Sequence, residues 1–217
     1  MDWNLGLYRF VRAALATLCR LAFRVRISGA DRLPATGPYV LAPSHRSIID
    51  IFVCSTLTRR RLRFMAKVEL FRVPVLGPFL GLMGSFPVER GATDRSAIEA
   101  GAQVLAEGEV LVIYPEGTRS NGAHITDLHR GAAYLAIKAG APVVPVGIGG
   151  TESILPSGSR IPKLHEVAIV VGDPIPSPTD DGTARRTDVR AVTDAIRSEL
   201  QAAFDIANTL AHVDRDA

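Results

Sequence analysis

Two residues that could share a proton lie close together in the sequence, His45 and Asp50. A histidine acts as a general base near neutral pH, and an acid bonded to one ring nitrogen fixes the tautomer and raises the basicity of the other nitrogen. Residues at this spacing lie about 140° apart on a regular helix, so these two meet only if His45 precedes the helix and Asp50 lies in its first turn. Ser47 would then be the N-cap. Ser47 and Asp50 also resemble a capping box, a structural role that the spacing alone leaves open.

The third member of a serine-hydrolase triad is missing from the sequence. The Gly-x-Ser-x-Gly turn that presents such a serine occurs nowhere in the chain. A base without a serine of its own indicates that the nucleophile is a hydroxyl group on the substrate. The pattern therefore favours transfer of an acyl group onto an alcohol.

A second polar group spans residues 114–120, Tyr-Pro-Glu-Gly-Thr-Arg-Ser, and follows a predicted strand. Functional loops of α/β proteins gather at the carboxyl ends of strands. Arg119 could bind a phosphate through two parallel hydrogen bonds. The structural alternative is an ion pair between Glu116 and Arg119 within the turn.

Two further cations, Lys67 and Arg90, lie at the ends of predicted strands and could bind the same anion. The alternative is that both are ordinary surface residues. His124 and His129 bracket Asp127 at a spacing that could suit a metal ion, but no cysteines support them, and we expect no metal site.

Hydrophobic periodicity predicts the elements that would position these residues. The predicted strands are Tyr39–Ala42, Leu62–Ala66, Ser85–Val88, Val110–Tyr114, Val143–Ile148 and Glu166–Val171. The predicted helices are Ile48–Thr58, Thr93–Glu107, Gly131–Ala139 and Thr187–Leu210, and Ile27–Pro38 is expected to be a loop. The alternation predicts an α/β fold with a mixed, mostly parallel sheet covered by helices.

The segment from Trp3 to Arg26 has the pattern of an amphipathic helix. One stripe carries Arg9, Arg12, Arg20 and Arg24, and the opposite side carries Leu7, Val11, Leu15, Leu18 and Phe23. We interpret residues 1–26 as a helix lying in a membrane interface and residues 27–217 as a single α/β domain. The alternative is a terminal helix packed on the domain with a solvated arginine face. No stretch has the roughly 20 apolar residues that span a bilayer.

Composition limits the remaining function classes. With 217 residues, 47% hydrophobic, the chain is an ordinary globular domain rather than a disordered or collagenous one. Residues 1–63 hold 11 Arg and 3 acids, a charge of +8, whereas the remainder holds 14 basic and 19 acidic residues, a charge of −5. The N-terminal part therefore faces something anionic, such as a bilayer or a phosphorylated substrate, and the run Arg59, Arg60, Arg61 and Arg63 could attract either. No motif indicates nucleic-acid binding.

Four blocks in order resemble the motifs of the glycerolipid acyltransferase family, which includes 1-acylglycerol-3-phosphate acyltransferases. They are SHRSIID at residues 44–50, GSFPVER at 84–90, YPEGTRS at 114–120 and VVPVGI at 143–148. The resemblance covers about half of the chain, from Tyr39 to Ile148. Two departures, Ser44 before the histidine and the Leu-His-Arg-Gly segment at 128–131, leave the acceptor's identity open.

The resemblance implies acyl transfer from acyl-CoA or acyl-ACP, as a co-substrate and with no tightly bound cofactor, to the free hydroxyl of a lysophosphatidate-type acceptor. It implies that His45 is the general base and Asp50 its orienting partner. The acceptor would contact Lys67, Arg90, Glu116, Gly117, Thr118 and Arg119. The expected partner is a phospholipid membrane, at the cytoplasmic face. Glycerol 3-phosphate or a head-group lysophospholipid as acceptor, or a catalytically silent protein that binds anionic lipid, remain alternatives, and the sequence does not fix the oligomeric state.

Overall fold

The computed structural model describes residues 3–88, 95–155, 161–179 and 181–211. Within these residues the strands form one sheet with the order β1-β7-β6-β2-β5-β3-β4. Neighbouring strands are parallel except for β6 and β7, which are antiparallel, so the prediction of a mixed, mostly parallel sheet is confirmed. The strands are β1 (Arg26–Ser28), β2 (Tyr39–Pro43), β3 (Leu62–Lys67), β4 (Phe86–Val88), β5 (Val110–Val112), β6 (Val143–Gly149) and β7 (Ala168–Val171).

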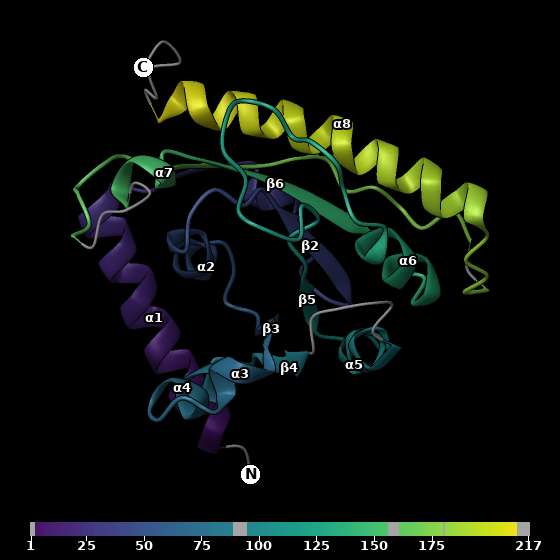
Figure 1. Cartoon of the computed structure of the whole chain (residues 1–217), viewed down its shortest axis with the longest axis horizontal. Helices are drawn as coiled ribbons and strands as arrows, with labels where there is room; N and C mark the ends of the chain where they lie inside the picture. The colour runs from purple at the N-terminus through teal and green to yellow at the C-terminus, as the bar shows by residue number, and fades with distance from the viewer. Residues whose placement is uncertain (1–2, 89–94, 156–160, 180, 212–217) are drawn as a thin grey trace.

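Helices cover both faces of this sheet (Figure 1). They are α1 (Trp3–Phe23), α2 (Ile49–Val53), α3 (Val68–Phe71), α4 (Leu76–Leu82), α5 (Arg95–Ala106), α6 (Gly131–Lys138), α7 (Thr151–Ile154) and α8 (Arg186–Leu210). On β2, Tyr39 and Leu41 point into the core beneath α1 and α2, whereas Val40 and Ala42 point into the core beneath α5, α6 and α8. Burial on both faces explains why the central strands are continuous apolar runs.

Two predicted elements differ from the structure. Residues 27–38 were expected to form a loop, but Arg26–Ser28 is an edge strand paired with β7. Its sequence signal is weak because only Ile27 is partly buried, and the residues on either side are exposed. The helix expected over Ile48–Thr58 ends at Val53, and a turn of 3₁₀ helix at Cys54–Thr56 follows.

The long helix α8 lies directly on strand β6. A Cβ atom added at Gly147 would lie 2.2 Å from the backbone carbon of Ala203, and one at Gly149 would lie 2.6 Å from the backbone of Ala207. Real Cβ atoms do not approach backbone this closely, so glycines on the strand and alanines on the helix permit the contact. Because β6 is the neighbour of β2, α8 supports the centre of the sheet.

The inner side of helix α1 packs on the domain, and its outer side does not. Tyr8, Ala16 and Cys19 are buried, and Cys19 belongs to the main core. On the outer side, by contrast, Leu7, Phe10, Leu18 and Leu21 are 41–77% exposed. In the described part of the chain, no helix is long and apolar enough to cross a membrane.

The arginines of α1 only partly follow the predicted outward stripe. Arg12 donates hydrogen bonds to the carbonyls of Ser55 and Thr58, and Arg20 donates to the carbonyl of Thr56. These two side chains therefore bind the domain. They satisfy carbonyl groups that the short helix α2 and the 3₁₀ turn leave without helical partners.

The basic run at residues 59–63 has a structural role that the sequence did not indicate. Arg60 donates to the carbonyls of Pro34 and Gly108, and Arg63 donates to Gly84 and contacts Glu109. The guanidinium of Arg61 lies over a tyrosine ring of α1. At least three of the four cations thus hold neighbouring segments together.

Candidate active site

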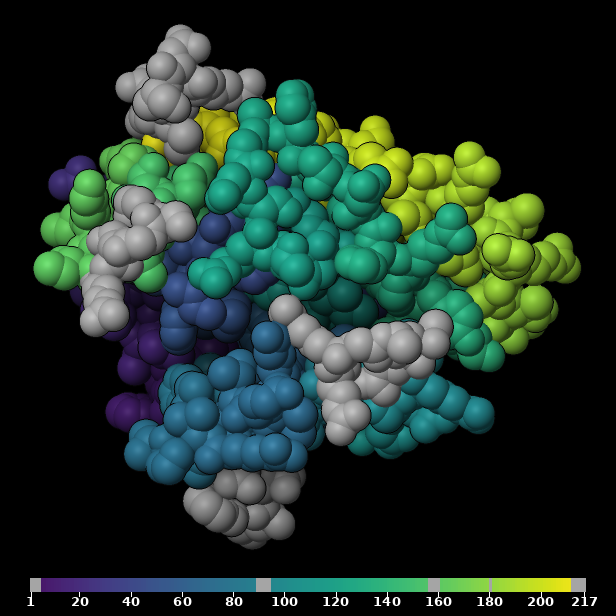
Figure 2. Space-filling view, viewed as in Figure 1, coloured from purple at the N-terminus to yellow at the C-terminus, as the bar shows by residue number. Residues whose placement is uncertain are grey.

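A cleft of about 1100 Å³ lies at the carboxyl edge of the parallel strands. His45 reaches it from the loop after β2, Lys67 from the end of β3, and Gly117, Thr118 and Arg119 from the loop after β5. Parallel strands end at the same edge, which brings together residues that are up to 74 positions apart in the chain. The space-filling view shows the loop after β5 lying beside α2 on this face (Figure 2).

The histidine and aspartate of the first motif meet as their spacing required. His45 Nδ1 lies 2.9 Å from Asp50 Oδ2, and the aspartate is fully buried. A carboxylate only accepts hydrogen bonds, so Nδ1 carries the proton and Nε2 keeps a lone pair. The arrangement therefore presents Nε2 as a base.

The same carboxylate also closes the loop on itself. Asp50 Oδ2 accepts hydrogen bonds from the backbone N–H groups of Arg46, at 2.7 Å, and Ser47, at 2.8 Å. The Ser47 hydroxyl in turn accepts the N–H of Ile49. The carboxylate thus stabilises the loop as well as contacting His45. The prediction that Ser47 is the N-cap is wrong, because α2 begins at Ile49 with Ile48 as its N-cap and without a side-chain cap hydrogen bond.

Tyr114 supports the histidine ring, although sequence reasoning gave it no role. The two rings stack with centroids 4.0 Å apart. Burial raises the pKa of Tyr114 well above its usual value, and burial also raises the pKa of the adjacent Cys54 thiol to about 12. Both groups therefore stay neutral at physiological pH, and Cys54 is not a thiolate nucleophile.

A buried ion pair holds the two motif loops together. Glu116 accepts the backbone N–H of His45 through Oε1, at 2.9 Å, and Nη1 of Arg46 through Oε2, at 2.6 Å. Both charged side chains are almost fully buried. The guanidinium of Arg46 lies 4.5 Å from the ring centroid of Phe204 on α8 and donates to the carbonyl of His124. Glu116 thus pairs with Arg46 rather than with Arg119, and it lies behind the cleft instead of lining it.

Arg46 was missed for an identifiable reason. Its position beside the histidine was visible in the sequence, but an arginine there could equally have faced a substrate phosphate. Its partner lies 70 residues away, and no local pattern connects the two. Of the other predicted residues, Arg90 lies outside the described residues.

Comparison with known proteins places the chain in a family. The family described as Acyltransferase matches residues 24–149, which is more than half of the chain. The chain belongs to this acyltransferase family. The protein is therefore an enzyme of the O-acyltransferase class.

Named relatives of this acyltransferase agree with the family. The 1-acyl-sn-glycerol-3-phosphate acyltransferase of Bacillus subtilis is 28% identical over 196 residues, covering 90% of this chain and 96% of the relative. A protein of the same name from Chlamydomonas reinhardtii is 34% identical over 71% of this chain, which spans 47% of that relative. The crystal structure of the 1-acyl-sn-glycerophosphate acyltransferase PlsC from Thermotoga maritima has the same fold, with a TM-score of 0.75 at 20% identity over 95% of this chain and 83% of that one.

In the acyltransferase, the backbone conformation and a neighbouring side chain both favour glycine at position 117. Its φ of +70° lies in the left-handed region, which glycine adopts without strain. A Cβ atom there would also lie 2.5 Å from the imidazole of His129. The ring of His129 lines the cleft beside Gly117, and the backbone N–H of His129 donates a hydrogen bond to the Pro115 carbonyl.

The opposite end of the cleft is apolar. Leu76, Phe79, Leu80 and Met83 line it from α4 and the turn that follows. Helix α4 therefore forms an apolar wall of the cleft, and Val75 at its start is 83% exposed.

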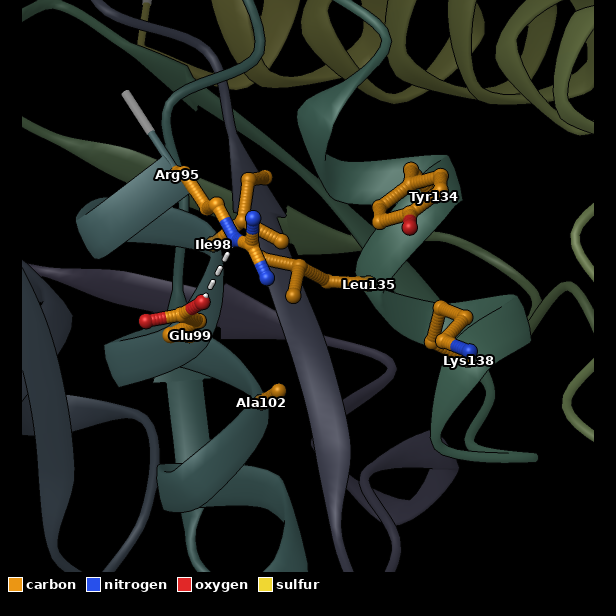
Figure 3. Close-up of a pocket in the computed structure, with 7 residues that line it drawn as sticks. All are labelled: Arg95, Ile98, Glu99, Ala102, Tyr134, Leu135 and Lys138. Atoms are coloured by element: carbon orange, nitrogen blue, oxygen red, sulfur yellow. Dashed lines mark hydrogen bonds and ion pairs between the residues drawn. The ribbon is translucent and has the colours of Figure 1, made fainter. Parts of the chain in front are cut away.

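A second depression, of about 280 Å³, lies between α5 and α6 (Figure 3). Its sides are formed by Arg95, Ile98, Glu99, Ala102, Tyr134, Leu135 and Lys138. None of the predicted catalytic or acceptor-binding residues belongs to it. Within the described ranges, no three His, Cys, Asp or Glu side chains are grouped so that they could hold a metal ion.

We predict that Arg46→Met will lower the free energy of unfolding by about 3–5 kcal/mol, because it leaves the buried carboxylate of Glu116 without a counter-charge. Urea denaturation followed by circular dichroism measures the change. The matched control is Arg95→Met, which breaks an exposed pair with Glu99 and should cost less than about 1 kcal/mol. Equal losses in the two variants would contradict a structural role for the buried pair.

Proposed function

We propose that the enzyme transfers a fatty acyl group from acyl-CoA or acyl-ACP to the free hydroxyl of a lysophosphatidate. The observation that carries the proposal is the His45–Asp50 pair in a cleft that also holds Arg119 and an apolar wall. The names of the relatives support the choice of acceptor. The product would be a phosphatidate, a precursor for phospholipid synthesis.

The proposed reaction begins with the acceptor hydroxyl hydrogen-bonded to Nε2 of His45. As the hydroxyl oxygen attacks the thioester carbonyl, its proton passes to Nε2, and Asp50 stabilises the resulting imidazolium. The tetrahedral intermediate then collapses, the carbon–sulfur bond breaks, and the thiol leaves with the proton from His45. No acyl-enzyme is formed, in keeping with the missing serine and the neutral Cys54.

The acceptor phosphate is proposed to bind the cations at the rim of the cleft. Arg119 offers two parallel donors, and Lys67 adds a charge from β3. Gly117 and Thr118 let the loop after β5 approach the phosphate closely, and we expect Arg90, which follows β4 in the sequence, to contribute as well. Glu116 would act indirectly, since both of its oxygens accept hydrogen bonds from the protein.

We further propose that residues 1–26 form the membrane-facing part of the enzyme and residues 27–217 the acyltransferase domain. The support is the unpartnered apolar side of α1, where Phe10, Leu18 and Leu21 are exposed. Both substrates are anionic amphiphiles that reside in or near a bilayer, so a helix lying in the interface would bring the cleft to them. On this proposal the enzyme works peripherally at the cytoplasmic face of the cell membrane.

The test is thiol release from oleoyl-CoA and from oleoyl-ACP in detergent micelles with a panel of acceptors. The panel contains 1-acylglycerol 3-phosphate, glycerol 3-phosphate and lysophosphatidylcholine. We expect release to require 1-acylglycerol 3-phosphate and to fall about 10²- to 10⁴-fold in His45→Ala, which lacks the general base. His124→Ala, in a loop near the cleft, should keep full activity.

Retention of activity in His45→Ala would remove the proposed base. Release that depends on His45 but prefers another acceptor would retain the mechanism and reject lysophosphatidate as the substrate.

We predict that Arg119→Ala will raise the KM for 1-acylglycerol 3-phosphate about 10- to 100-fold, because a charge-assisted pair of hydrogen bonds to the phosphate is lost. The KM for the acyl donor should change much less. Steady-state kinetics with each substrate varied in turn measures both values. The control is Arg130→Ala, which removes a nearby exposed cation. A similar rise of KM in both variants would indicate that Arg119 contributes only general electrostatic attraction for the anionic substrate.

We predict that Leu18→Asp combined with Leu21→Asp will abolish sedimentation of the enzyme with vesicles of phosphatidylglycerol and phosphatidylcholine. Both side chains are already exposed, so the fold should persist. The control is Ile206→Asp, which places the same charge at an exposed apolar position on α8. Vesicle binding by the double variant at the wild-type level would rule out the outer side of α1 as the membrane contact.

A further inference from the structure

Thr151, the first residue of α7, reaches the catalytic aspartate from a distant part of the chain. Its hydroxyl donates a hydrogen bond to Oδ1 of Asp50 at 2.5 Å, across 101 residues of sequence. Thr151 has no exposed surface, and neither does Asp50. Because both groups are buried, water cannot replace the threonine hydroxyl as a hydrogen-bond donor to this carboxylate.

The two oxygens of Asp50 have different tasks. Oδ2 receives His45 together with the backbone N–H groups of Arg46 and Ser47. Oδ1 accepts a hydrogen bond from Thr151. Loss of that donor would leave Oδ1 buried without this partner and the carboxylate held through Oδ2 alone. The carboxylate would then tilt about its Cβ–Cγ bond and misalign His45, while the hydrogen bond between Oδ2 and His45 persists.

The fold fixes the position of Thr151 closely. Strand β6 runs parallel to β2, so its carboxyl end lies beside the loop that carries His45. Gly150 then turns the chain with a φ of +90°, and a Cβ atom there would lie 2.2 Å from the carbonyl oxygen of Glu166. The short helix α7 packs against α2, which holds Asp50. The turn therefore directs Thr151 toward the aspartate.

The negative charge of Asp50 acts on several titratable or charged neighbours. The groups that contact it or respond to its charge are His45, Arg46, Cys54, Tyr114 and Glu152. Glu152 lines the cleft, and its pKa is raised by burial and, to a smaller extent, by the negative charge of Asp50. Arg46 is occupied by Glu116. A side-chain donor on Oδ1 consequently moderates a negative charge that the nearest cation does not neutralise.

We propose that Thr151 is a positioning residue of the active site, which holds the Asp50 carboxylate in the orientation that His45 needs and disperses part of its charge. The proposal rests on the proposed function, because it concerns the base of that reaction. A carboxylate with fewer donors attracts a positively charged imidazole more strongly. Loss of the Thr151 hydroxyl would therefore favour the positively charged imidazole, which cannot act as the base.

The test compares Thr151→Val, which removes only the hydroxyl, with Thr151→Ser, which restores it. The matched control is Thr193→Val on α8, where a threonine that is also buried donates to a backbone carbonyl far from the site. We expect Thr151→Val to lower kcat about tenfold with little change in KM. We also expect the pH at which kcat/KM reaches half its plateau to rise by about half a unit. Thr151→Ser should recover both, and Thr193→Val should change neither.

A second measurement reads the histidine without any substrate. Diethyl pyrocarbonate reacts with neutral imidazole, and peptide mapping by mass spectrometry isolates the reaction at His45 from that at the other histidines. The half-maximal pH of this reaction should rise in Thr151→Val by the same amount as the kinetic value. Because it needs no acyl transfer, this measurement still decides the role of Thr151 if lysophosphatidate proves not to be the acceptor.

Two results would overturn the proposal. One is a His45 reaction profile in folded Thr151→Val that matches the wild-type profile. The other is a decrease in activity shared equally by both valine variants, which would indicate a general effect of hydroxyl loss on the fold. Thermal unfolding of each variant shows which molecules are folded, and Thr151→Ser provides the comparison if the valine variant is unstable.

Discussion

The structure of the active site depends on stabilising one negative charge, that of Asp50, which is buried away from water. A carboxylate in that position must be compensated by hydrogen-bond donors, or it would destabilise the fold. The donors come from the loop after β2 and from the turn after β6. The hydrogen bonds that satisfy the carboxylate therefore hold these two chain segments together, and they fix the position of the His45 ring beside it.

A second buried charge extends this arrangement to the other motif. Arg46, which lines the cleft, is neutralised by Glu116 behind it, and Glu116 also accepts the backbone N–H of His45. The loop after β5 is thus attached to the loop after β2 by its acid, while its arginine, Arg119, lines the cleft. Residues three positions apart in one motif thus differ in position, because the acid joins the two loops and the arginine lines the cleft. Since the acid is paired with Arg46, it does not offset the positive charge of Arg119 at the rim.

Three features could be predicted from the sequence: the mixed, mostly parallel sheet, the contact between His45 and Asp50, and the position of Arg119 in the cleft. Each depends on a local signal, namely hydrophobic periodicity, the start of a helix or the end of an apolar run. The sequence did not contain the roles of Arg46 and Thr151, because their partners are 70 and 101 residues away and a lone arginine or threonine has no distinguishing pattern. The inward contacts of Arg12 and Arg20 were hidden for a related reason. An amphipathic pattern separates the polar side of a helix from its apolar side. It does not reveal that the polar side donates hydrogen bonds to backbone carbonyls of another segment.

The contact between α8 and β6 has a consequence for the order in which the molecule is completed. Gly147 and Gly149 are covered by the backbone of Ala203 and Ala207, and Phe204 between them packs on Arg46. These helical residues lie more than 150 positions after His45 in the chain. During synthesis the histidine and its aspartate emerge from the ribosome long before the helix that completes their surroundings. The nascent chain therefore carries the His45–Asp50 pair before the packing that surrounds it in the folded protein can form.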